Sequence, residues 1–201
     1  MLISGFTDWG RLARALAFYQ KNGFLRVELD WHAPREICAL TCSDDSRMYA
    51  FDGDYLVGSA EQSFIHAMTL DTLPKGRYVA LTPCFRREPA VSETHLLQFM
   101  KVELFASHDA DPDVALQFAR LANRFMREET SHDVDMVETP EGYDLEIGGI
   151  EVGSYAARTA GGMSWTCGTG LAEPRFSTAV ENKAVGLTPI RTQRQSETAS
   201  A

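Results

Sequence analysis

The sequence predicts an α+β fold, in which a largely antiparallel sheet is flanked by helices. Three observations lead to this prediction. A segment with helical periodicity lies near the N-terminus, alternating segments typical of strands follow in pairs, and one long amphipathic helix separates two groups of strands. This order differs from the regular alternation of strands and helices that predicts a parallel sheet.

The length and composition fit one globular domain. The chain has 201 residues, of which 44% are hydrophobic and 23% are charged, and we expect the domain to cover residues 1–186. Residues 187–201 are polar and are predicted to form a disordered tail. No apolar run is long enough to cross a membrane. The formal net charge of −9 argues against a broad nonspecific nucleic-acid surface.

The N-terminal part is predicted to form a helix and then a strand. Apolar residues recur at helical spacing over residues 9–22, with Thr7 or Asp8 as the cap and Gly23 at the end. Residues 24–31 alternate between apolar and polar, which predicts a half-buried strand. The predicted buried face carries Leu25, Val27, Leu29 and Trp31.

The middle of the chain predicts short strands, a helix and a hairpin. The short strands are expected over residues 47–51 and 55–57, and the helix is expected to start near Ser59. Residues 77–83 and 95–105 have the alternation of strong strands, with a turn-rich segment between them. They therefore predict an antiparallel hairpin.

The clearest helix of the sequence covers residues 111–129. Asp111 is a good cap, and Pro112 suits the first turn. An apolar stripe along this helix contains Val114, Phe118, Leu121 and Phe125. The last predicted elements are two strands, a glycine-rich segment and a helix, over residues 143–147, 150–158, 167–175 and about 174–184.

The cysteines indicate a reducing environment. There are four of them, and they are scattered along the chain rather than spaced as a disulfide framework. The N-terminal residues also lack the pattern of a signal peptide. We therefore expect free thiols and a cytoplasmic location.

Charged residues occupy one face of the predicted hairpin. Phe99 and Glu103 lie on the same side of one strand because strand side chains alternate, and Arg86 and Glu88 share a side at the end of the other. Lys101 is expected to point outward or to lie at the rim. The simplest interpretation is a solvated face with surface ion pairs, and the alternative is a binding surface.

A second polar cluster comes from the two strands that follow the long helix. Glu146, Glu151 and Ser154 lie close together in the sequence, with Arg158 just beyond. Two neighbouring carboxylates repel each other when buried, and a cation such as Mg²⁺ relieves this repulsion beside substrate phosphates. A solvated surface is again the simpler alternative.

The glycine-rich segment GTGLAEPR precedes the last predicted helix. Glycines before a helix allow the backbone to approach a phosphate group. The segment lacks the Gly-Lys-Ser/Thr ending of a P-loop and the β-α-β surroundings of a dinucleotide site. By itself it is a weak indication of nucleotide binding.

Taken in order, five segments resemble the class II aminoacyl-tRNA synthetases, and most closely seryl-tRNA synthetase. ALAFYQKNGFLRVELDWHAP is similar to motif 1, CFRREP with QFMKVELF to motif 2, and GTGLAEPRF to motif 3. YLVGSAEQSF resembles the segment that holds the substrate amino group, and IEVGSYAAR resembles the one that holds ATP and its metal. The resemblance covers roughly residues 9–184 and implies a class II synthetase-like catalytic domain.

The resemblance implies a role for six residues in binding ATP. Arg86 would hold the α-phosphate and stabilise the charge that develops during transfer, and Glu88 would bind the adenine amino group. Phe99 would stack on one face of adenine, and Arg175 would cover the other face and reach the γ-phosphate. Glu151 and Ser154 would bind Mg²⁺ and phosphate oxygens.

The resemblance also implies where the amino acid binds. Ser59 and Glu61 would contact its ammonium group, and Glu103 would accept a hydrogen bond from its hydroxyl group. Thr169 stands where some seryl enzymes place a second hydroxyl partner. A buried carboxylate favours a substrate that donates a hydrogen bond, so serine is preferred, with threonine, alanine and glycine left open.

Some features depart from the family. The motif 2 loop PAVSETH is short, and His95 stands where an arginine commonly helps to hold ATP. The N-terminal arm that grips tRNA has no counterpart in this sequence. The acceptor is therefore left open between a tRNA, a carrier protein and a small molecule.

Motif 1 implies a homodimer through residues 9–34. Related enzymes with zinc use two cysteines and a glutamate, but only Cys167 and Glu103 match, so zinc is not expected.

Two further hypotheses compete with amino-acid activation. The chain would be a non-catalytic synthetase paralogue if the short loop and His95 removed the chemistry. It would be an amide-forming synthetase if ammonia or an amine attacked the adenylate.

Overall fold

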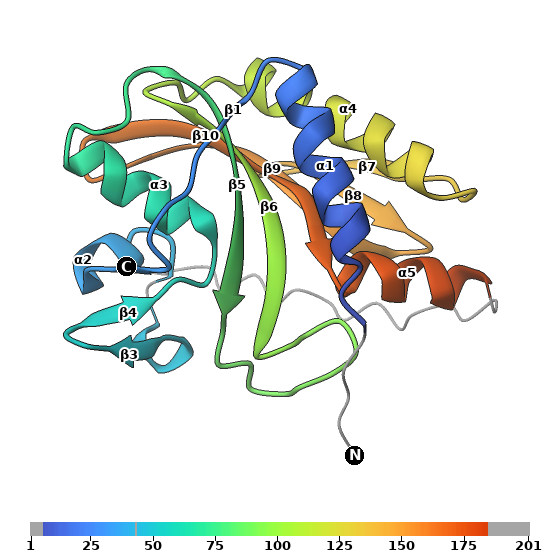
Figure 1. Ribbon diagram of the computed structural model, residues 1–201, viewed down its shortest axis with the longest axis horizontal. Coiled ribbons are helices and arrows are strands. Elements are labelled where there is room, and N and C mark those ends of the chain that lie inside the picture. Colours follow the sequence, from blue (N-terminus) through green and yellow to red (C-terminus); the bar gives the residue numbers. More distant parts are fainter. Residues whose placement is uncertain (1–5, 43, 185–201) are drawn as a thin grey trace.

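Within the residues that the computed structural model describes, 6–42 and 44–184, seven strands form one main sheet. Its order is β1-β5-β6-β10-β9-β8-β7, and its neighbouring strands are antiparallel except for β1 and β5 (Figure 1). The strands are β1 (Leu25–Arg26), β5 (Gly76–Phe85), β6 (Gln98–Ser107), β7 (Asp135–Thr139), β8 (Gly142–Ile147), β9 (Ile150–Ala160) and β10 (Met163–Glu173).

Each face of the sheet supports a hydrophobic core of its own. One core joins the sheet to α1 (Trp9–Lys21), α4 (Pro112–Glu129) and α5 (Arg175–Ala184). The other joins it to α2 (Arg35–Cys38), α3 (Ala60–Thr69) and a small sheet. That small sheet contains β2 (His32–Ala33), β4 (Asp54–Leu56) and β3 (Tyr49–Phe51), and the 3₁₀ turn η1 (Asp45–Arg47) directly precedes β3. The predicted α+β architecture of an antiparallel sheet flanked by helices is confirmed.

Side-chain caps set the starts of three helices. Asp8 accepts a hydrogen bond from the Arg11 amide at the start of α1 (2.8 Å), and Asp111 accepts one from the Asp113 amide at the start of α4 (2.8 Å). Ser59 is the N-cap of α3. The predicted starts of these helices are therefore confirmed, and each helix begins where a side chain satisfies an orphan amide.

The segment over residues 24–31 differs from the prediction. Only Leu25–Arg26 pairs as a strand, and the side chains of Leu25 and Trp31 are 62% and 55% exposed. The predicted buried face is therefore wrong at both of its ends. The physical reason is position, because β1 is an edge strand and the chain then leaves the sheet to reach β2.

The glycine-rich segment before α5 is a strand and not a phosphate-binding loop. It forms the last part of β10, which is buried between β6 and β9. Gly168 lies under the Tyr155 ring and Gly170 under the Tyr19 ring, where a Cβ atom would overlap an aromatic ring. The glycines therefore allow close packing of aromatic rings on the strand.

The predicted hairpin is confirmed as β5 and β6, in register from Gly76 opposite Ser107 to Phe85 opposite Gln98. The strand β7 was not predicted. The tail over residues 187–201 lies outside the described residues. None of the helices in the described part of the chain is long and apolar enough to cross a membrane.

Candidate functional site

A cavity of about 300 Å³ opens on the face of the sheet that carries α3. Strands β6, β9 and β10 supply its floor, the start of α3 and the end of β5 supply one wall, and the start of α5 supplies the other. Nine of the ten predicted site residues line it: Ser59, Glu61, Arg86, Phe99, Glu103, Glu151, Ser154, Thr169 and Arg175. Segments far apart in the sequence therefore meet at one site.

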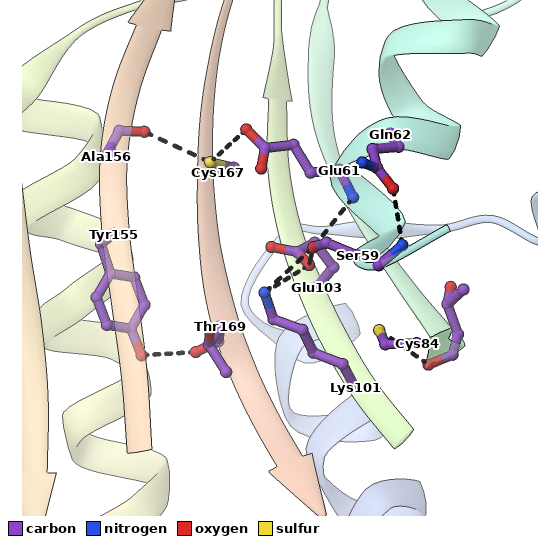
Figure 2. Close-up of polar contacts among 12 residues, drawn as sticks. Ser59, Glu61, Gln62, Cys84, Lys101, Glu103, Tyr155, Ala156, Cys167 and Thr169 are labelled. Atoms are coloured by element: carbon purple, nitrogen blue, oxygen red, sulfur yellow. Dashed lines mark hydrogen bonds and ion pairs between the residues drawn. The ribbon is translucent and has the colours of Figure 1, made fainter. Parts of the chain in front are cut away.

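Glu103 lies at the floor of this cavity and is only 1% exposed. The Ser59 hydroxyl donates to its Oε2 atom at 2.6 Å, and Lys101 Nζ lies 2.8 Å from the same oxygen (Figure 2). Burial raises the pKa of the Glu103 carboxyl above its ordinary value, and Lys101 opposes this rise. A carboxylate at this position is held ready to accept a further hydrogen bond from a ligand.

Lys101 lies inside the cavity, so its predicted place at the rim is wrong. Its side chain is mostly buried, and Nζ also lies 3.3 Å from the Ser59 hydroxyl. The alternation of β6 already places it on the same face as Phe99 and Glu103. That periodicity was the signal in the sequence that could have found it.

Glu61 is fixed by donors from β10. Trp165 Nε1 donates to Glu61 Oε1 at 2.7 Å, and the Cys167 thiol donates to the same oxygen at 3.2 Å. Arg158 Nε lies 3.7 Å away and gains a raised pKa chiefly from the Glu61 charge. Burial holds the pKa of Cys167 well above its ordinary value. Glu61 therefore sits in the cavity as an oriented carboxylate (Figure 2).

Thr169 lies on β10 across the cavity floor from Glu103, and the two residues are register partners. Its carbonyl oxygen accepts a hydrogen bond from the Tyr155 hydroxyl at 2.6 Å (Figure 2). This bond anchors the backbone of β10 to β9 beside the cavity.

The outer half of the cavity is aromatic and cationic. The Arg86 guanidinium lies over the Phe99 ring, 5.1 Å from its centre, and Arg86 Nε donates to the Gly58 carbonyl oxygen at 2.9 Å. Arg175 Nε donates to the Thr94 carbonyl oxygen at 3.0 Å. Burial lowers the pKa of Arg175 from its ordinary value. One guanidinium group therefore covers the Phe99 ring, and the other is bonded to the loop between β5 and β6.

Glu88 is the one predicted site residue that does not line the cavity. Its Oε2 atom accepts a hydrogen bond from Arg47 at 2.7 Å, and Arg47 does line the cavity. The Arg87 amide also donates to the Arg47 carbonyl oxygen at 3.0 Å. Arg47 was missed because no periodicity links it to the hairpin. His95 lies in the exposed loop, where it bonds Ser92 and does not line the cavity.

The second predicted cluster divides between the cavity and its surroundings. Glu151 and Ser154 line the cavity, and Glu151 Oε1 lies 3.7 Å from Arg175 Nη1. Glu146 is the register partner of Glu151 but does not line the cavity. Among the described residues, no group of three or more His, Cys, Asp or Glu side chains is placed to hold a metal. One carboxylate and one hydroxyl suit Mg²⁺ where phosphate oxygens complete its coordination.

The cavity is positively charged although the chain is acidic. Of the described side chains, five cations and three carboxylates line it. The cations are Arg47, Arg86, Lys101, Arg158 and Arg175, and the carboxylates are Glu61, Glu103 and Glu151. The cavity therefore attracts a polyanion more strongly than the rest of the surface does, because the whole chain has a net charge of −9.

Three solved structures with similar folds provide a comparison. The first is a seryl-tRNA synthetase from Pyrococcus horikoshii complexed with ATP, with a TM-score of 0.66 and 20% identity over 85% of this chain. The second is a pyrrolysyl-tRNA synthetase from Desulfitobacterium hafniense, with a TM-score of 0.63 and 17% identity over 86% of this chain. The third is a cytoplasmic serine-tRNA ligase from Naegleria fowleri in complex with AMP, with a TM-score of 0.64 and 15% identity over 87% of this chain.

The chain spans only part of these proteins, corresponding to 48%, 68% and 54% of their respective chains. It thus spans about half the length of the two seryl structures. Neither a scan against protein-family models nor a search of curated proteins finds a match for the sequence. The similarity therefore establishes the fold, and the fold agrees with the resemblance found in the sequence.

Proposed function

We propose that this chain, which has the fold of class II aminoacyl-tRNA synthetase catalytic cores, activates a small amino acid with ATP. The substrate carboxylate attacks the α-phosphorus, the bond to pyrophosphate breaks, and an aminoacyl-adenylate forms. Serine is the preferred substrate. The observation that carries this proposal is that nine residues implied by the sequence resemblance line a single cavity on this fold.

The outer half of the cavity is assigned to ATP. Adenine would stack on Phe99 and take the place that the Arg86 guanidinium holds in this structure, which frees Arg86 to bind the α-phosphate. Arg175 would cover the other face of the base and reach the γ-phosphate. The Arg47–Glu88 pair offers a donor beside an acceptor at this end, which suits the edge of an adenine base.

The inner half is assigned to the amino acid. Glu61 would receive the ammonium group, together with Ser59, and Glu103 would accept from the side-chain hydroxyl near Thr169. Ser59 and Lys101 hold one oxygen of Glu103, which orients the carboxylate before the substrate arrives. A substrate without a side-chain donor would leave a buried carboxylate with a poorer set of partners.

Glu151 and Ser154 would hold Mg²⁺ together with the phosphate oxygens of ATP. The metal would neutralise charge on the triphosphate and help to orient it for in-line attack. Zinc is not part of the proposal, since only Cys167 and Glu103 match the two cysteines and one glutamate that related zinc enzymes use.

The proposal includes a homodimer and a reducing cellular location. The exposed apolar side chains of Leu25 and Trp31 support an interface formed by residues 9–34. All four cysteines are free thiols, which supports a cytoplasmic protein. The acceptor of the activated amino acid is a tRNA, a carrier protein or a small molecule.

Amino-acid-dependent exchange of labelled pyrophosphate into ATP tests the activity. We expect serine to give the fastest exchange in a panel of the standard amino acids, and Glu103→Gln to slow exchange with serine more than exchange with alanine. A folded wild-type protein that exchanges pyrophosphate with none of the panel would disprove amino-acid activation.

One observation favours a non-catalytic paralogue as the second candidate. Arg86 rests on Phe99, and Glu88 is paired with Arg47, so two nucleotide contacts are occupied by the protein itself. Calorimetric ATP binding without any pyrophosphate exchange would support this alternative. An amide-forming synthetase would show exchange and would also release an amide when ammonia or an amine is added.

A further inference from the structure

The turn between β10 and α5 has the cavity on one side and a buried ion pair on the other. Ala172 and Arg175 line the cavity. Glu173 lies between them in the sequence, and its side chain is fully buried against α1. The first turn of α1 approaches the start of α5 at this point (Figure 1). A single turn thus connects α1 to the proposed nucleotide site.

Arg11 is the cation that meets this buried carboxylate. Its Nη1 atom donates to Glu173 Oε1 at 2.5 Å and to the Ser177 hydroxyl at 2.8 Å. Glu173 Oε2 in turn accepts from the Ser177 amide at 3.3 Å, in the first turn of α5. The Arg11 guanidinium also lies over the Phe176 ring, 5.0 Å from its centre. Arg11 therefore contacts α5 and the strand end that leads into it.

Two further carboxylates, just before α1 and at the end of α4, hold the Arg11 side chain in position. Its guanidinium lies within 3.5 Å of carboxylate oxygens of Asp8 and Glu129. Further along α1, the Tyr19 hydroxyl donates to the Gly170 carbonyl oxygen at 2.8 Å. The helix is therefore bonded to the last part of β10 at two places, on either side of Leu171 and Ala172.

A buried carboxylate is costly unless it is paired, and removing its partner leaves an uncompensated charge. Burial raises the pKa of Glu173, while Arg11 opposes that rise. Ser177 is hydrogen-bonded to both Arg11 and Glu173, so the network restrains the backbone direction at the start of α5. Arg175 is the first residue of that helix, so the backbone direction there determines where its guanidinium lies.

We infer that Arg11 and Glu173 are positioning residues that set the placement of Arg175 for the triphosphate. This inference rests on the proposed role of the cavity in ATP binding. Neither residue lines the cavity, so their effect reaches the nucleotide through Arg175. An error of about 1 Å in placement is enough to cost up to two orders of magnitude in rate.

A double-mutant cycle between Arg11→Gln and Arg175→Ala tests the coupling. We expect Arg11→Gln to weaken calorimetric ATP binding roughly tenfold and to raise the KM for ATP in pyrophosphate exchange by a similar factor. The KM for the amino acid should stay within about twofold, because Ser59, Glu61 and Glu103 lie at the start of α3 and on β6, away from the turn that joins β10 to α5. In the Arg175→Ala background, Arg11→Gln should change ATP binding by less than about twofold.

Arg14→Gln is the matched control. Arg14 lies on the same helix and pairs with Glu129 through two hydrogen bonds, but it does not contact β10 or α5 in the described residues. It should leave ATP binding unchanged. Ser177→Ala is the milder variant if Arg11→Gln fails to fold, and it should raise the KM for ATP by a smaller factor in the same direction.

Several outcomes would overturn the inference. Arg11→Gln could weaken ATP binding by the same factor with and without Arg175, which indicates a general structural effect. It could raise both KM values equally, or it could change neither while the wild type binds ATP. A wild-type protein that neither binds ATP nor exchanges pyrophosphate would instead remove the proposed function, and this inference with it.

Discussion

At the scale of single residues, Glu103 is stabilised by its two partners against the cost of burial. Lys101 and Ser59 both reach its Oε2 atom, yet its pKa remains raised because desolvation outweighs their effect. Glu129 shows the opposite balance. Two hydrogen bonds from Arg14 lower the pKa of the Glu129 carboxyl. These two carboxylates should therefore affect stability with opposite dependence on pH.

The pKa of Glu103 predicts how stability changes with pH. Its folded-state pKa lies above 4.5, so the folded protein binds this proton more tightly than the unfolded chain. The contribution of Glu103 to the free energy of unfolding is therefore present below about pH 4.5 and lost as the pH rises through the folded-state value. We expect Glu103→Gln to become more stable relative to wild type over this interval, as measured by urea unfolding at several pH values.

Glu129→Gln is the control with the opposite sign. The lowered pKa of Glu129 contributes stability above its unfolded value, and this contribution is lost as the pH falls. The Gln variant should therefore become less stable relative to wild type as the pH rises. Parallel pH profiles for the two variants would contradict the assignment of these shifts.

Strand alternation pointed to part of the site, and the family resemblance implied most of the remaining residues. Phe99 and Glu103 follow from the period of two residues along β6, and the same reasoning includes Lys101. The Arg47–Glu88 pair could not be predicted, because both residues lie outside the main sheet and meet only through tertiary folding. Periodicity predicts which residues share a face, but it does not predict how irregular segments close over that face.

At the scale of elements, α4 connects the helical layer to the sheet. Its buried side includes Val114, Phe118 and Phe125, as the apolar stripe predicted, while Leu121 is only partly buried. Phe118 packs against Phe24, with ring centres 5.1 Å apart. This contact joins the long helix to the segment that enters β1.

Truncating Phe118 should reveal how much this layer contributes to stability. We expect Phe118→Ala to lower the free energy of unfolding by about 3–5 kcal/mol, because it leaves a cavity in a packed core. The exposed Arg120 on the same helix provides the control, and Arg120→Ala should change that free energy by less than about 0.5 kcal/mol. Urea denaturation measures both. A loss below about 1 kcal/mol at Phe118 would mean that the core closes around the smaller side chain.

The elements that were predicted correctly have strong local signals. Helices α1, α3 and α4 begin at capping side chains, and the β5–β6 hairpin follows from alternation. The last part of β10 was not predicted to be a strand, because its glycines are uncommon in strands and are required here by tyrosine rings from other elements. The exposure of Leu25 and Trp31 likewise depends on β1 being at the edge, which is a property of the whole sheet.

At the scale of the whole molecule, the edge strand β1 is an open surface. It is paired on one side with β5, and apolar side chains remain exposed along the segment that follows it. Exposed edges and apolar patches of this kind are commonly covered by another chain. The proposed homodimer provides such a cover.

Charges placed on this surface should separate the proposed dimer. We expect wild-type protein to sediment with twice the mass of one chain, and the Leu25→Glu and Trp31→Glu double variant to sediment as a monomer. Leu70→Glu places the same charge at an exposed leucine after α3, outside residues 9–34, and should leave the dimer intact. A wild-type monomer at micromolar concentration would contradict this interface.

The contrast between a cationic cavity and an acidic chain has a consequence for the kinetics of ligand capture. A nucleotide that approaches from a distance meets the field of a molecule with nine excess negative charges, and is repelled until it reaches the cavity mouth. At physiological ionic strength the Debye length is about 8 Å, which screens this repulsion more than it screens the partly buried contacts. Moderate salt should therefore accelerate the association of ATP, the reverse of the usual behaviour when opposite charges steer a ligand to its site.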